Sequence, residues 1–335
     1  MGIDLGTTTT LVYCKDKGIV INEPSVVAVN VRTDEILAVG EEAKKMIGKT
    51  PAHIMAIKPL VDGVISDFEV AEKMLKYFID KVHSEGFMLM PRPRVVIGIP
   101  LDITEVEKKA VEDAVKSAGA REVFLVEESM AAAVGARLPV TEAIATMVVD
   151  IGGGTTEIAV ISLSGVVNWK TLRVAGIELD NNIIQYIREE FNILIGEQLA
   201  EQIKVTIGSA TPLKDPLVMQ VRGRDLINGL PRAVEINDGQ VREAIGKTVN
   251  QIIESIKITL ETTPPELVSD IYEHGIVLTG GGALLRGFDK EIAQATKTPV
   301  RIADDPLTCV VRGTGILLSN PELLSKVITP NTEEF

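Results

Sequence analysis

The chain has 335 residues, of which 45% are hydrophobic and 24% charged, and its formal net charge is −13 at pH 7. Such a chain is globular and long enough to form two domains. Its acidic balance, with no long Lys/Arg run to offset it, argues against nucleic acid as a partner. Two distant cysteines and three scattered histidines argue against a zinc site and favour a reducing compartment. No apolar run approaches the length of a membrane span, so we expect a cytosolic protein.

Apolar strands and amphipathic helices alternate along the first half, which is typical of an α/β protein. In chain order we expect a hairpin over residues 2–13, strands at 19–21 and 25–31, a small subdomain over 32–65, a helix over 67–82, a strand at 95–99, a helix over 104–119 and a strand at 123–126. Thr104 and Glu107 form the capping-box pattern that begins the second of these helices. The last strand runs directly into Glu127-Glu128-Ser129 and an alanine-rich helix.

The second half repeats this plan. In chain order we expect a hairpin over residues 148–161, a strand at 170–174, helices over 179–191 and 197–207, short strands near 217–236, a long helix that begins after Asn237-Asp238, and a buried strand at 275–278. That last strand ends in a glycine turn immediately before another helix. The repetition predicts two related halves.

Two strand–turn–strand segments share one motif, an Asp delivered by an apolar strand and followed by a glycine- and threonine-rich turn. The first contains Asp4 and the turn residues Gly6, Thr7, Thr8 and Thr9; the second contains Asp150 and the turn residues Gly152, Gly153, Gly154 and Thr155. Glycine lets backbone N–H groups approach an anion closely, and threonine hydroxyls add donors. A carboxylate beside a phosphate requires a divalent cation, such as Mg²⁺ held through water. Two such turns facing each other would clamp the phosphates of a nucleotide.

A single copy of this motif is more often a tight turn that needs glycine, but two copies in matching context favour the nucleotide interpretation. Other phosphate motifs are incomplete. Gly48-Lys49-Thr50 and Gly246-Lys247-Thr248 resemble the end of a P-loop but lack its upstream glycine. No G-x-G-x-x-G lies between a strand and a helix, which argues against a dinucleotide-binding fold.

Three other features allow two interpretations each. The turn Gly280–Gly282 follows a strand, where α/β proteins bind ligands, but it could be a plain strand–helix turn. Glu128 could orient a water for attack on a γ-phosphate, or could be a first-turn acid favoured by the helix dipole. Glu201 and Lys204 lie three residues apart on one helix face, a spacing that most often makes a surface ion pair.

At this point the sequence is similar to the actin/Hsp70/sugar-kinase superfamily and, nearly end to end, to the MreB family of bacterial actins. The segments that carry the resemblance are Asn22–Val27, Asp62–Ile65, Val123–Ala133, Asp150–Glu157, Thr263–Leu267 and Thr279–Leu285. The chain departs from the usual family pattern at Thr9, where Asn is usual, and at Ser129, where Pro is usual. Few residues precede Asp4, whereas many relatives carry more at this end.

The resemblance implies an actin-like α/β fold, in which two related domains, each with a mixed sheet and flanking helices, hold a nucleotide in the cleft between them. Subdomain IA would comprise residues 1–31, 66–139 and 313–335, and subdomain IB residues 32–65. Subdomain IIA would comprise residues 140–178 and 238–312, and subdomain IIB residues 179–237. The chain crossings near Ala136–Pro139 and Gly313–Gly315 would form the hinge.

The resemblance also assigns roles to individual residues around ATP or ADP. Asp4 and Asp150 would hold Mg²⁺ through water, Glu128 would polarise the attacking water, and Thr155 would assist it. The phosphates would lie against Gly6, Thr7, Thr8 and Thr9 and against Gly152, Gly153, Gly154 and Thr155; the adenosine would lie between Glu201 and Lys204 on one side and Gly280, Gly281 and Gly282 on the other.

An apolar run, Phe87-Met88-Leu89-Met90, follows a predicted helix and precedes Pro91-Arg92-Pro93-Arg94. Such a run in a loop indicates an interaction site if it is exposed, although it could fold under and pack on the domain. Relatives use a hydrophobic loop at this place to enter the membrane. We therefore expect Phe87, Met88, Leu89 and Met90 to contact the inner face of the cytoplasmic membrane.

The resemblance implies an ATPase that polymerises into double protofilaments at the membrane and organises cell-wall synthesis and rod shape. Its expected partners are further copies of the chain and membrane proteins of the wall-synthesis machinery. Two alternatives stay open: another bacterial actin, for plasmid segregation or organelle alignment, and a small-molecule kinase of the same superfamily.

Overall fold

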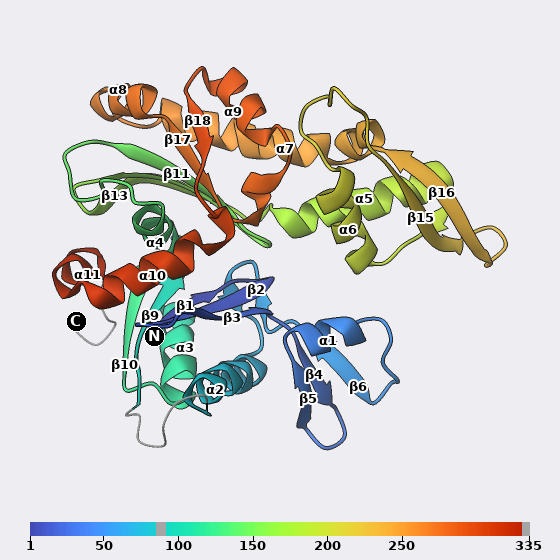
Figure 1. Ribbon diagram of the computed structural model, residues 1–335, viewed down its shortest axis with the longest axis horizontal. Helices are drawn as coiled ribbons and strands as arrows, with labels where there is room; N and C mark the ends of the chain where they lie inside the picture. Colours follow the sequence, from blue (N-terminus) through green and yellow to red (C-terminus); the bar gives the residue numbers. More distant parts are fainter. Residues whose placement is uncertain (85–91, 330–335) are drawn as a thin grey trace.

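The computed structural model describes residues 1–84 and 92–329 and consists of two stacked halves (Figure 1). Within those residues, each half is built on a five-stranded sheet, with strand order β10-β9-β1-β2-β3 in the first and β18-β17-β11-β12-β13 in the second. In both sheets the first hairpin is antiparallel and the later strands add in parallel. The two halves therefore repeat one topology, as the repeated sequence plan predicts.

The first half contains β1 (Gly2–Leu5), β2 (Thr9–Cys14), β3 (Gly18–Pro24), β9 (Arg94–Ile99), β10 (Glu122–Glu127), α2 (Phe68–Ser84) and α3 (Glu105–Ser117). Helices α2 and α3 pack their apolar faces on one side of this sheet. The predicted capping box begins α3, because the Thr104 hydroxyl accepts from the Glu107 N–H and the Glu107 side chain accepts from the Thr104 N–H.

The second half contains β11 (Thr146–Ile151), β12 (Thr156–Ser162), β13 (Gly165–Leu172), β17 (Ile276–Thr279), β18 (Val300–Ile302), α7 (Asp238–Glu261), α8 (Pro265–His274), α9 (Phe288–Thr296) and the 3₁₀ helices η1 (Gly281–Leu284) and η2 (Pro306–Thr308). The predicted strand at 170–174 is wrong in its bounds. Leu163 and Ser164 both have positive φ, 51° and 65°, and make a two-residue turn. Because that turn follows β12 directly, β13 begins at Gly165 and ends at Leu172.

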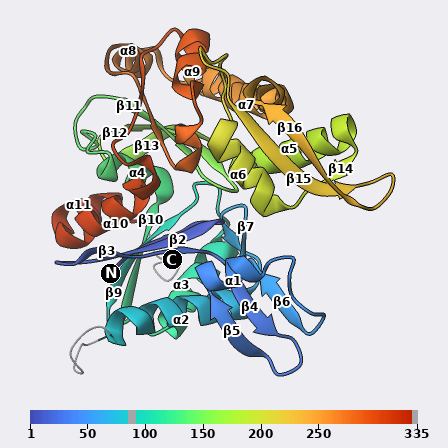
Figure 2. The same cartoon turned by 45° about the vertical axis from the view of Figure 1, so that its right-hand side comes forward.

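Each half carries a smaller unit at one end of its sheet (Figure 1). The first unit contains β4 (Val27–Asn30), β5 (Glu35–Val39), β6 (Ile54–Ile57), β7 (Leu60–Val61), β8 (Val64–Ile65) and α1 (Glu41–Met46). The second contains β14 (Ile193–Leu194), β15 (Val218–Asp225), β16 (Pro231–Asn237), α5 (Gly176–Phe191) and α6 (Glu197–Ile207). Figure 2 shows α1 and α6 facing each other across the space between the halves.

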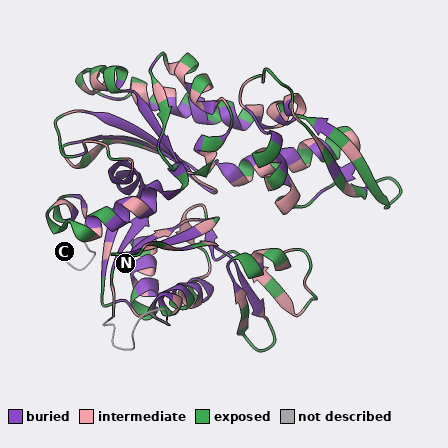
Figure 3. Cartoon of the chain, in the orientation of Figure 1, coloured by how far each residue is buried: buried purple, intermediate pink, exposed green. Residues whose placement is uncertain are grey.

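Between the halves lie α4 (Glu128–Gly135) and α10 (Cys309–Ser319), followed by α11 (Pro321–Val327). One buried cluster joins these helices to residues of both sheets, including Val96 of β9 and Ala159 of β12. Figure 3 shows the same region as buried. Within residues 1–84 and 92–329, no helix combines the length and apolar character needed to cross a bilayer.

Candidate functional site

The two glycine- and threonine-rich turns, one from each half, meet in the structure. The turn between β1 and β2 carries Gly6–Thr9, and the turn between β11 and β12 carries Gly152–Thr155. A Cβ at Gly153 would overlap the Thr8 side chain, and a Cβ at Gly154 would lie 2.8 Å from the Thr7 hydroxyl. Glycine is needed at these positions because the opposite turn approaches so closely. The predicted pairing of the two motifs is therefore seen as a direct contact.

Residues outside the predicted set hold the first turn in place. The Ser25 hydroxyl donates to the Gly6 carbonyl (2.6 Å) and lies 2.9 Å from the Thr10 hydroxyl. The Gly63 N–H donates to the Thr7 hydroxyl (2.8 Å). Asp62 and Gly63 have φ of 49° and 80°, and their Asp-Gly dipeptide is a turn signal that could have pointed to this contact.

Asp4 lies on β1 and Asp150 on β11, which are the central strands of the two five-stranded sheets. Burial and the nearby Asp150 charge raise the pKa of Asp4 to about 8. Burial raises the pKa of Asp150 to about 6, opposed by a hydrogen bond from the Thr279 hydroxyl to Asp150 Oδ1 (2.7 Å). Two carboxylates held this close in a low-dielectric site are stabilised by a cation. Among the described residues, they belong to no cluster of three or more His, Cys, Asp or Glu side chains.

Glu128 is the first residue of α4, directly after β10, and it is buried. Its position in the first turn of α4 agrees with the helix-dipole interpretation, and its role toward a γ-phosphate stays a prediction. Burial, followed by the charge of Glu157, raises the pKa of Glu128 well above its ordinary value. Thr155, which was predicted to assist it, is also buried.

The third glycine turn follows β17 and packs against β11. Gly280 has a φ of 76°, and a Cβ there would overlap the Ile151 carbonyl. A Cβ at Gly282 would overlap the Ile151 side chain, whereas Gly281 is exposed. A 3₁₀ helix, η1, follows the turn before α9 begins at Phe288. Close packing against Ile151 therefore explains why glycine occupies positions 280 and 282. The turn lies beside β11, the strand that carries Asp150.

Glu201 and Lys204 both lie on α6 but do not make the ion pair that their spacing most often forms, and their place beside the adenosine stays a prediction. Lys204 Nζ donates to the Gly176 carbonyl (2.8 Å) and pairs with Asp180 (2.9 Å). Glu201 pairs instead with Lys44 of the opposite half (2.7 Å). The Lys204 side chain thus reaches the segment that follows the second turn, since the Gly176 N–H donates to the Gly152 carbonyl. The sequence gives no signal for partners so distant along the chain.

The predicted apolar loop, Phe87-Met88-Leu89-Met90, lies outside the described residues. The other predicted site residues all lie on the turns, strand ends or helices that border the space between the halves (Figure 2).

Comparison with known proteins decides the family. The family model for MreB/Mbl proteins matches residues 1–326. The chain belongs to the MreB/Mbl family. It is 52% identical over 321 residues to the cell shape-determining protein MreB of Escherichia coli K12, which covers 94% of the chain and 92% of that relative. It is 47% identical over 326 residues to the cell shape-determining protein Mbl of Bacillus subtilis 168, which covers 97% of each.

Solved structures of MreB/Mbl-like and other bacterial actins share the fold. The crystal structure of MreB5 of Spiroplasma citri bound to ADP has a TM-score of 0.91 and 38% identity, with 96% of each chain covered. The same protein bound to AMPPNP has a TM-score of 0.90. The MamK double helical filament has a TM-score of 0.78 and 25% identity, over 95% of this chain and 98% of that one. The predicted actin-like fold is thereby confirmed.

Proposed function

We propose that the protein binds and hydrolyses ATP between its two halves and that the bound nucleotide controls its assembly into filaments that determine cell shape. The observation that carries this proposal is the contact between the two glycine- and threonine-rich turns, each with its own aspartate. The glycines of both turns let backbone N–H groups approach an anion and the threonines add hydroxyl donors, which are the groups that bind a polyphosphate. ADP and AMPPNP in MreB5 of Spiroplasma citri support the choice of ligand.

The residues divide the chemistry among them. Gly6–Thr9 and Gly152–Thr155 bind the phosphates, and Asp4 and Asp150 would hold Mg²⁺, which would neutralise phosphate charge. Glu128 holds the attacking water beside the terminal phosphate and accepts its proton, since burial and the nearby Glu157 charge raise the pKa of this carboxyl and so make it a stronger base.

Filament formation and cell-shape control are supported by the relatives. The MamK relative forms a double helical filament, and the MreB and Mbl relatives are named as cell shape-determining proteins. These names favour the cell-shape role over plasmid segregation and over a small-molecule kinase. The filaments consist of double protofilaments on the inner face of the cytoplasmic membrane, where they engage membrane proteins of the wall-synthesis machinery.

The first experiment tests the nucleotide switch by sedimentation. We expect the purified protein to pellet with Mg-ATP, and the Asp150→Ala variant to stay in the supernatant because Mg-ATP is no longer oriented. Asp215→Ala removes an equally acidic but exposed side chain in a loop and serves as the matched control. A protein that binds ATP yet stays soluble in every condition would contradict the proposal.

The second experiment tests the membrane loop. We expect the protein to co-sediment with liposomes that contain anionic lipid, and the double variant Phe87→Ser, Leu89→Ser to lose this binding while it still binds ATP. Leu163→Ser removes another apolar side chain, 68% exposed on the β12–β13 turn, and should leave liposome binding unchanged. Equal co-sedimentation of the double variant and the wild type would exclude the loop as the contact.

A further inference from the structure

Glu157 is a buried acid between the two halves, and the function proposed above assigns it no role. It lies on β12 and is paired in register with Asp150 of β11, which is in turn paired with Thr279 of β17. Residues in register across a sheet point to the same face. Glu157 therefore shares the face of Asp150, and the next residue on that face of β12, Ala159, packs in the cluster that includes α4. That helix begins with Glu128.

The carboxylate of Glu157 reaches from the second half to the first. Its Oε1 accepts a hydrogen bond from the Leu101 N–H (2.8 Å), just after β9 ends. Ile99 of β9 is paired with Glu127 of β10, and Glu128 follows at once. The Glu128 side chain lies against Gly98 of β9, 3.0 Å from a Cβ built there, and the Glu157 charge acts on it, so both acids lie near the end of β9.

The second oxygen of this carboxylate is available. Glu157 is 1% exposed, and within residues 1–84 and 92–329 its Oε2 has no hydrogen-bond partner. A buried carboxylate costs more free energy than a buried amide, and a glutamine would satisfy the Leu101 N–H equally well. Anchoring Leu101 therefore accounts for one oxygen of Glu157 and leaves the second oxygen unexplained.

We propose that Glu157 is a second acidic catalytic residue, which with its free Oε2 orients the water that Glu128 deprotonates. This inference rests on the proposed ATP hydrolysis. The water oxygen forms a bond to the terminal phosphorus as the bond from that phosphorus to the bridging oxygen breaks, the bridging oxygen leaves with its electron pair on ADP, and the water proton passes to Glu128. Glu157 accepts a hydrogen bond from the second O–H of the water, so that two carboxylates set its orientation.

Three substitutions separate this role from simple anchoring. Glu157→Gln keeps the side-chain length and the acceptor for Leu101 but loses the charge. Glu157→Asp keeps the charge but is one methylene shorter, and Glu157→Ala removes both. If the Glu157 carboxylate orients the water, the single-turnover rate of phosphate release should decrease from wild type to Glu157→Asp to Glu157→Gln. The Gln and Ala variants should be slower than the wild type by about 10²-fold. A purely structural anchor predicts the reverse order for Asp and Gln, and that result would overturn the proposal.

Two further readouts complete the test. The affinity for Mg-ATP and pelleting with AMPPNP should stay within about twofold of the wild type in Glu157→Gln, because ground-state binding does not use this oxygen. A large loss of Mg-ATP affinity would instead place Glu157 in nucleotide or Mg²⁺ binding and overturn its assignment to water. If Glu157→Gln does not fold, the Glu157→Asp and Glu157→Ala variants are compared instead, since only the Asp variant retains the carboxylate and should hydrolyse ATP faster.

Wild-type protein and Glu128→Gln are measured in parallel. A wild type that binds ATP but never hydrolyses it contradicts the proposed function itself. A slow Glu128→Gln beside an unchanged Glu157→Gln contradicts only this inference.

Discussion

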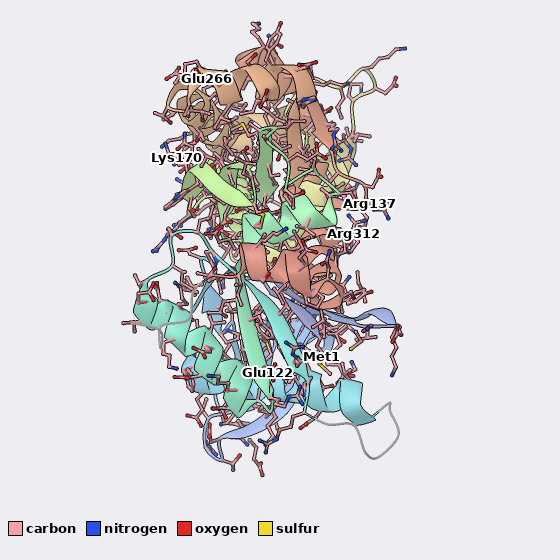
Figure 4. The ribbon with its side chains drawn as sticks, turned by 90° about the vertical axis from the view of Figure 1, so that its left-hand side faces the viewer. Met1, Glu122, Arg137, Lys170, Glu266 and Arg312 are labelled. Atoms are coloured by element: carbon pink, nitrogen blue, oxygen red, sulfur yellow. The ribbon has the colours of Figure 1, made fainter. Side chains whose placement is uncertain are left out.

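The two halves of the molecule are joined in two regions that differ in kind. At the base, α4 and α10 cross with their backbones in contact: a Cβ at Gly135 would overlap the Cys309 carbonyl, and a Cβ at Gly313 would overlap the Ala131 carbonyl. Figure 4 shows this junction, with Arg137 and Arg312 labelled beside it. Such close crossing requires glycine on both helices and excludes water.

At the mouth, the halves meet through charged side chains near the surface. Lys44 pairs with Glu201 at 2.7 Å, and Lys58 pairs with Glu197 at 2.6 Å. The Gln198 side chain also donates to the Lys44 carbonyl. The four charged side chains are between 33% and 60% exposed, so each pair contributes roughly 0–1 kcal/mol.

The difference shows how one structure can be both firmly joined and able to open. Separating α4 from α10 would expose a buried cluster shared by both sheets, whereas separating α1 and Lys58 from α6 costs little more than two solvated ion pairs. Relative motion of the halves therefore breaks the mouth first and pivots about the base. The glycine turns lie between these regions, so their separation changes with that motion.

The largest expected effect comes from breaking the base. Gly313→Ala places a methyl group against the Ala131 carbonyl, and we expect it to lower the free energy of unfolding by about 4 kcal/mol or more. Urea unfolding followed by circular dichroism measures this change. Gly246→Ala in α7 is the matched control, because nothing lies within 4 Å of its Cβ, and it should be neutral or slightly stabilising. Equal stability of the two variants would show that the helices separate easily.

A smaller effect is expected from three acids between the halves, Asp4, Asp150 and Glu157, when Mg²⁺ and nucleotide are removed. Burial raises the pKa of Asp4 and of Glu157 to about 8 and that of Asp150 to about 6, whereas these groups titrate near pH 4 in an unfolded chain. The folded state therefore holds protons more tightly, which stabilises it at low pH, and this stabilisation is lost as pH rises towards 8. We expect the free energy of unfolding in EDTA to fall steadily between pH 5 and pH 8, which urea unfolding at a series of pH values measures.

The same pH series has an internal control. Adding Mg²⁺ should flatten the profile, because a cation stabilises the charged forms of Asp4 and Asp150. Glu157→Gln removes one titrating group and should reduce the slope. A profile in EDTA that is already flat would show that these carboxyls are as well solvated as the exposed ion pairs at the mouth.

The smallest effect is expected at the mouth. Lys44→Ala combined with Lys58→Ala removes both cross-cleft ion pairs, and we expect a fluorescent ADP analogue to dissociate about fivefold faster, equivalent to about 1 kcal/mol. Lys45→Ala is the matched control, since Lys45 pairs only weakly with Glu41 of its own helix, at 3.9 Å. Wild-type protein in 0.5 M salt should approach the rate of the double variant, because salt screens exposed pairs. Unchanged release would show that the mouth does not limit nucleotide exchange.

Much of the fold and site could be predicted because its signals are local. The capping box at Thr104 involves residues three apart, and each glycine- and threonine-rich turn follows its own Asp within a few residues. The start of β13 was missed because Leu163 and Ser164 adopt positive φ without the glycine that usually marks such a turn.

The sequence by itself determined the repeated order of strands, the two glycine- and threonine-rich motifs and the chemical types of the side chains at the site, since these depend on periodicity and on spacing within one segment. Only the tertiary structure decided which residues from different halves meet. Glu201 contacts Lys44 and Glu157 contacts Leu101, partners separated by 157 and 56 residues along the chain. Such contacts depend on how the helices at the base set the two sheets against each other, and no local pattern encodes that geometry.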